Sequence, residues 1–145
     1  MIKRIGALRA FLFAAAAVML LGALLLRLPG RGADASTREG RQRYLSELGW
    51  QIDPESEEEK LVRIPDCGTG VMADYNALQQ AQGYDLSAWT ERSVKQYSYR
   101  VTNYPGYDGT VYVTLYVSGR RVIGGDVHSA ALNGFMHGLI RDTGD

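Results

Sequence analysis

The chain has 145 residues and a formal net charge of zero, with sixteen Lys and Arg residues against sixteen Asp and Glu. None of the acidic residues precedes Asp34, so the part from residue 33 onward carries a net charge of −5. An acidic remainder of about 110 residues leaves room for one domain and argues against nucleic-acid binding. Because Cys67 is the single cysteine, an internal disulfide is excluded.

The N-terminus has the pattern of a membrane anchor or a signal segment. Three basic residues, the last of them Arg9, precede seventeen apolar or small residues at 10–26. As a helix this run spans about 26 Å, which is close to the hydrocarbon thickness of a bilayer. Ala33-Asp34-Ala35 offers a signal-peptidase site before Ser36. Because arginines between the apolar run and this site are unusual for a signal peptide, we expect residues 1–28 to stay as a single-pass anchor. Cleavage after Ala35 would instead give a secreted protein.

Residues 29–35 contain Pro29 and two glycines, which predicts a flexible linker. The short N-terminal tail and this linker favour export, so we expect residues 36–145 to form a single extracytoplasmic domain. The arginines at positions 27, 31, 38, 41 and 43 favour the opposite orientation by a simple count of positive charge.

The first half of this domain predicts two helices. Ser36 and Glu39 have the spacing of a capping box, and the helix that follows ends at Gly49 before a short strand at 49–52. The acidic run 53–59 lacks the ligand spacing of a calcium loop, so we interpret it as a solvated connection before a strand at 60–65. A second helical pattern runs from Thr69 to Gly83.

The second half changes to a period of two. Residues 93–101, 110–117 and 121–123 alternate like strands, joined by a hairpin at 103–109 and a tight turn at 118–120. We therefore predict an α+β domain of two layers, in which a mainly antiparallel sheet with a C-terminal three-stranded meander is covered on its Val and Leu face by both helices.

The C-terminal stretch 124–139 contains both histidines. Asp126 and His128 are two residues apart, so on a strand they point the same way, and His137 could complete a three-ligand metal site. The structural alternative is that Gly124 and Gly125 permit a bulge or a close backbone approach, with Asp126 capping the next turn. We expect the structural role, and therefore no metal and no cofactor. Cys67 lacks the local signature of a nucleophile.

Tyrosines on one strand face are typical of sugar-binding or peptide-binding surfaces, although they also suit an ordinary half-solvated strand. The candidate binding residues are Tyr104, Tyr107, Tyr112 and Tyr116.

Five further segments form a set of motifs, at residues 44–50, 62–65, 75–86, 123–127 and 133–136. Together they resemble an uncharacterised bacterial family, domain-of-unknown-function family 4830, which comprises short, singly anchored proteins of Gram-positive bacteria. The resemblance implies an exported single domain and assigns no catalytic residues.

We therefore predict a membrane-tethered extracytoplasmic binding or regulatory module without catalysis of its own. Its expected partners are the membrane, through the N-terminal helix, and an extracytoplasmic protein or cell-wall component. One alternative is a small inhibitor-like regulator of an exported peptidase. Another is a metal-dependent enzyme that uses the region from Gly124 to His137.

Overall fold

The computed structural model describes residues 32–141, and the predicted anchor at 1–28 lies outside them. The described helices are α2 (Arg38–Glu47) and α3 (Gly70–Ala81), with 3-10 turns η1 (Pro54–Ser56) and η2 (Leu86–Trp89). Within residues 32–141, no helix has both the length and the apolar character needed to cross a bilayer.

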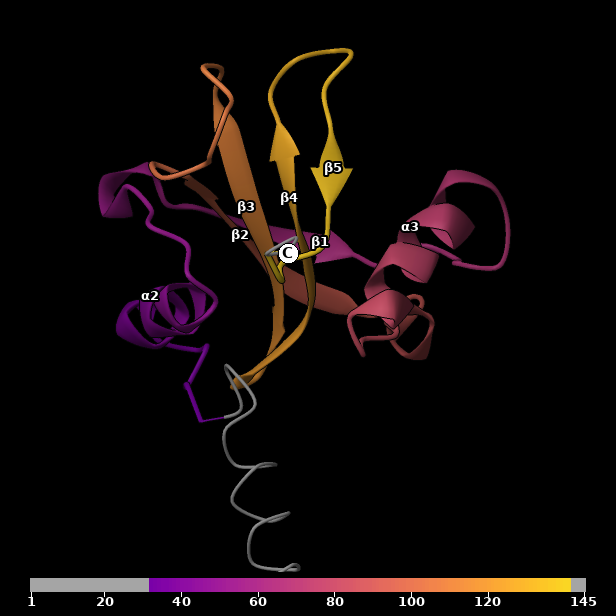
Figure 1. Cartoon of the computed structure of the whole chain (residues 1–145). Coiled ribbons are helices and arrows are strands. Elements are labelled where there is room, and N and C mark those ends of the chain that lie inside the picture. The colour runs from indigo at the N-terminus through magenta and orange to yellow at the C-terminus, as the bar shows by residue number, and fades with distance from the viewer. Residues whose placement is uncertain (1–31, 142–145) are drawn as a thin grey trace, which may run out of the picture. The chain divides into compact units, whose positions relative to one another are not determined.

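The described strands form a five-stranded antiparallel sheet in the order β1-β2-β3-β4-β5 (Figure 1). The sheet is an up-and-down meander, because each strand pairs with its neighbour in the sequence. The strands are β1 (Glu58–Arg63), β2 (Ser93–Arg100), β3 (Val111–Ser118), β4 (Arg121–Ser129) and β5 (Met136–His137). The α+β class and the predicted three-stranded meander are thus confirmed, with one more strand at each edge. The strand predicted at 49–52 contributes a single bridge, Ile52 to Val101.

The two helices lie on opposite faces of the sheet (Figure 1). Tyr44 and Leu45 of α2 pack on the face that carries Tyr99 and Leu115, which we call the α2 face. The opposite face, which we call the α3 face, carries a second cluster that includes Met72 and Tyr75 of α3, with Ile64, Leu86, Val94 and Ile123. The prediction that both helices cover one face in two layers is therefore wrong. The sheet has apolar side chains on both faces, so each face needs its own cover.

The chain joins the domain before the predicted boundary at Ser36. Ala35 is 1% exposed, and its N–H donates to the carbonyl of Arg120 at 3.0 Å. The Asp34 carboxylate pairs with Arg120 at 2.7 Å. The backbone carbonyl of Asp34 occupies the space that a Cβ at Gly40 would need. The end of the predicted linker, Ala33 to Ala35, is therefore packed against the turn between β3 and β4. The N-cap of α2 is Thr37 rather than the predicted Ser36, because the Thr37 Oγ1 accepts from the Gly40 N–H at 3.0 Å.

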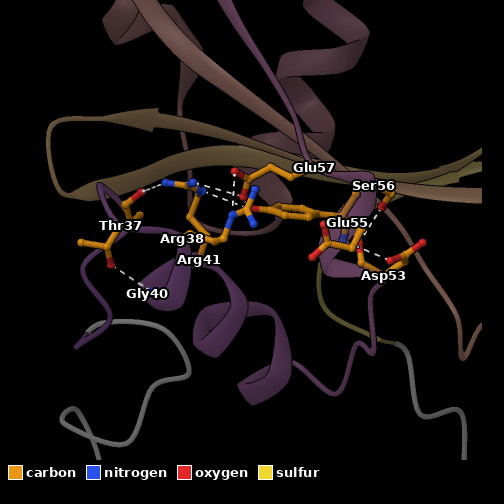
Figure 2. A network of polar contacts seen from close by, with 10 residues as sticks. Thr37, Arg38, Gly40, Arg41, Asp53, Glu55, Ser56 and Glu57 are labelled. Carbon is orange, nitrogen blue, oxygen red and sulfur yellow. Dashed lines mark hydrogen bonds and ion pairs between the residues drawn. The ribbon is translucent and has the colours of Figure 1, made fainter.

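A buried polar network fastens α2 to the sheet (Figure 2). The Arg41 guanidinium lies over the Tyr97 ring, 3.5 Å from its centroid, and donates to the Tyr99 hydroxyl at 2.9 Å and to Glu57 at 3.1 Å. Tyr99 also donates to Glu57. Burial raises the pKa of the Glu57 carboxyl, but the hydrogen bonds from Tyr99 and Arg41 outweigh it, so the net pKa lies below its usual value. Glu57, which belongs to the acidic run predicted as a solvated loop, therefore holds α2 against the sheet.

Candidate binding surface

The register of the sheet places four side chains in one row on the α3 face. Arg100 pairs with Tyr112, Tyr112 with His128, and His128 with Met136, so four neighbouring strands each contribute one residue. Directly paired residues in a sheet point to the same face, with neighbouring strands about 4.8 Å apart. We call these four residues the open row.

Neither helix covers the open row. The α3 helix packs nearer the other end of the same face, where Tyr75 meets the Tyr116 ring edge-on at 6.3 Å between centroids. The Arg100 side chain is 53% exposed and Met136 is 52% exposed, whereas Tyr112 is half-buried. The row therefore consists of exposed and half-buried side chains on a part of the α3 face that α3 does not cover.

A buried carboxylate orients the histidine of the row. Asp126 is 3% exposed and accepts hydrogen bonds from the Tyr75 hydroxyl and from His128 Nδ1, the latter at 2.7 Å. With Nδ1 held by Asp126, the ring of His128 has no partner at Nε2 among residues 32–141. The hydrogen bond to Asp126 raises the pKa of His128, and partial burial opposes this effect. Burial and the charge of Asp126 raise the pKa of Tyr75.

The two loop tyrosines belong to an aromatic cluster at the same end of the sheet. Tyr104 stacks on Trp50 and on Phe135, with ring centroids 5.8 and 4.8 Å away, and its side chain is half-buried. Tyr107 meets Phe135 edge-on at 5.2 Å. The Tyr104 hydroxyl also lies 2.9 Å from Nε2 of His137. These rings hold the loop between β2 and β3 against the core and leave little free aromatic face for a ligand.

The four predicted binding tyrosines therefore do not form one surface. Tyr112 lies in the open row, Tyr116 lies beside α3, and Tyr104 and Tyr107 lie in the aromatic cluster. The sequence reasoning missed Arg100 and Met136 as members of the row. The sequence shows that Arg100 alternates with apolar neighbours. It does not show the strand pairing that aligns Arg100 and Met136 with Tyr112.

The three weak metal candidates do not converge. Asp126 and His128 lie together on the α3 face, whereas His137 pairs with Val127 and bonds to Tyr104 on the other face. Successive residues on a strand point to opposite faces, which separates His137 from the pair. Within residues 32–141, no three His, Cys, Asp or Glu side chains are placed to hold a metal ion.

The glycines before Asp126 have the predicted close backbone approach. A Cβ at Gly124 would lie 3.0 Å from Gln79 Oε1, and one at Gly125 would overlap the Thr114 carbonyl. The expectation that Asp126 caps the following turn is wrong, because both carboxylate oxygens are used by Tyr75 and His128.

Among residues 32–141, Cys67 has no hydrogen bond to a histidine or a carboxylate. The residue is 7% exposed, and its thiol donates to the Pro65 carbonyl at 3.4 Å. Burial and the charge of Asp66 raise its pKa, which disfavours the nucleophilic thiolate.

Comparison of the chain with models of protein families, with curated proteins and with solved structures gave no match in any of the three. The resemblance to domain-of-unknown-function family 4830 therefore stays a prediction.

Proposed function

We propose that this protein is an extracytoplasmic binding or regulatory module, tethered to the membrane by its N-terminal segment, that binds a protein partner through the open row. The observation that carries the proposal is the alignment of Arg100, Tyr112, His128 and Met136 on an uncovered part of the sheet. Arg, Tyr and Met are enriched at protein interfaces relative to the rest of the surface.

The row lies far from the point at which the N-terminal segment joins the domain. The chain joins the domain at Ala35, beside Arg120 in the turn that follows β3. The row crosses β3 at Tyr112, six residues before the end of that strand at Ser118, or about 20 Å away. The row therefore lies towards the end of the sheet that is distant from Ala35.

Contacts of Asp34 and Ala35 support retention of the anchor over secretion. Cleavage after Ala35 would remove a buried alanine, the ion pair of Asp34 with Arg120 and the carbonyl that Arg41 Nη1 contacts at 3.0 Å. Gly40, in the first turn of α2, leaves room for the Asp34 carbonyl, which would overlap a Cβ at this position. The intact mass of the membrane-extracted protein tests this, because a chain that begins at Ser36 would contradict retention.

The metal-dependent enzyme is the weaker candidate. Its three-residue set is divided between the two faces, which leaves the pair of Asp126 and His128. Tyr112 and Thr114 of β3 pair with His128 and Asp126, and no hydroxyl among residues 32–141 forms a hydrogen bond with His128.

The binding function is tested by capture from membranes. A tagged full-length chain with Tyr112→Ser and Met136→Ser should recover its partner at least tenfold less well than the wild type. Leu61→Ser is the matched control, since Leu61 is 74% exposed but lies on the edge strand β1, outside the row. Equal recovery by the wild type and the row variant would contradict the proposal.

A further inference from the structure

We propose that the open row recognises an acidic and apolar segment of its protein partner, in which a carboxylate meets Arg100, a further acceptor meets His128 and an apolar side chain meets Met136. This inference rests on the proposed binding function and names the chemistry of the partner. It is carried by the hydrogen-bonding groups that the fold leaves open along the row.

Arg100 and Tyr112 supply donors at one end of the row. Arg100 contacts Asp53 through Nη2, and its Nε and Nη1 have no partner among residues 32–141. The Tyr112 hydroxyl has no partner in the same part of the chain. Donors aligned on one exposed strip match a ligand that carries acceptors, of which carboxylates bind arginine most strongly.

His128 completes the donor set when it is protonated. Its Nδ1 is occupied by Asp126, so the second proton of the imidazolium would sit at Nε2, on the open side of the ring. The titratable and charged groups that face it are Tyr112 from β3, Asp126 from β4 and, through Asp126, Tyr75 from α3. The Asp126 carboxylate favours the charged ring, so the row gains a second cation when His128 is protonated.

Met136 favours a peptide over an anionic polysaccharide. A methionine that is 52% exposed at the end of a row of donors offers an apolar contact for a side chain, and an acidic glycan has no equivalent group. Arg100 and Met136 lie three strands apart, or about 14 Å. An extended peptide covers this distance in about four residues, so the expected motif has an acidic and an apolar residue four positions apart.

Selection from a random display library of 12-residue peptides on the full-length chain in detergent micelles tests the inference at pH 6. Enriched peptides should contain Asp or Glu about four positions from Leu, Met or Phe. Their affinity should fall at least tenfold with Arg100→Gln and with His128→Gln, and Arg100→Lys should restore part of the loss. Arg121→Gln is the control, because Arg121 is an exposed cation at the other end of β4.

His128→Gln removes a hydrogen-bond partner of the buried Asp126 and could therefore unfold the domain. Each variant is first checked for an unchanged circular-dichroism spectrum. If His128→Gln is unfolded, Arg100→Gln alone tests the inference. Enrichment of peptides without acidic residues, equal binding by the row variants, or no enrichment at all would overturn the inference. Polygalacturonate that binds the wild type, but not Arg100→Gln, would also overturn it in favour of an anionic glycan. The proposed binding function is judged separately, by membrane capture with the Tyr112 and Met136 variants.

Discussion

The two faces of the sheet differ in how they are covered. The α2 face is closed by α2 and by Trp50, and its strand residues Tyr99, Val113 and Leu115 are completely buried. The α3 face has a packed half under α3 and an uncovered half that carries the open row. The comparison indicates that one face supplies most of the stability and that the exposed half of the other is available for recognition.

The largest effect is expected where the α2 face contains a buried charge. Arg41→Ala would remove the buried one of the two cations that pair with Glu57, whose side chain is 11% exposed, and would leave only the half-exposed Arg38 at 3.3 Å. Breaking such a pair by removing one member costs about 3–5 kcal/mol. Urea unfolding of the wild type and variant measures this. A loss below about 1 kcal/mol would show that water replaces the guanidinium.

A core truncation on the same face comes next. Leu115 is 0% exposed, in the middle of β3, so Leu115→Ala would leave a cavity and should lower the free energy of unfolding by about 3 kcal/mol. The same urea experiment measures it, with Leu61→Ala on the exposed edge as the control. Similar losses of unfolding free energy at both positions would contradict the burial of Leu115 in the core of the α2 face.

On the α3 face, the pair of Asp126 and His128 predicts a pH effect. The folded pKa of His128 is raised above its ordinary value of 6.5, so the pair contributes its full stabilisation below that pH. The contribution is lost as the pH rises through the folded pKa. NMR titration of the His128 ring should give a midpoint above 6.5, and His128→Gln should remove this part of the pH dependence of unfolding. A midpoint below 6.5 would contradict the hydrogen bond to Asp126.

The smallest effect on stability is expected in the open row itself. Met136→Ser and Arg100→Gln change half-exposed side chains, so each should alter the free energy of unfolding by no more than about 0.5 kcal/mol. Thermal unfolding of the variants checks this. A loss of more than 2 kcal/mol would assign the row to the packed part of the α3 face and would remove the separation between stability and recognition.

Much of the fold follows from local patterns. The period-two alternation of β3 and the helical spacing of Tyr75 and Leu78 predict elements that the structure contains. The second core was not predictable in the same way, because Leu86, Val94 and Ile123 come from three separate segments and form no periodic signal. This is why the sequence interpretation placed both helices on one face.

The candidate site shows the same limit. The spacing of Asp126 and His128 predicts correctly that they share a strand face, since residues two apart on a strand point the same way. Nothing in the spacing predicts that Tyr75 reaches Asp126 from α3 or that His137 turns away towards Tyr104. Those contacts depend on where distant segments meet.

By itself, the sequence determined the α+β class, the three-stranded meander and the presence of two helices, because these depend on hydrophobic periodicity and turn residues within a few positions. The tertiary structure alone decided that Arg100, Tyr112, His128 and Met136 form one row. It also decided that Ala35 belongs to the core rather than to the linker. The physical reason is that strand register and the packing of distant segments select partners across the chain, whereas local periodicity specifies only which side each residue faces.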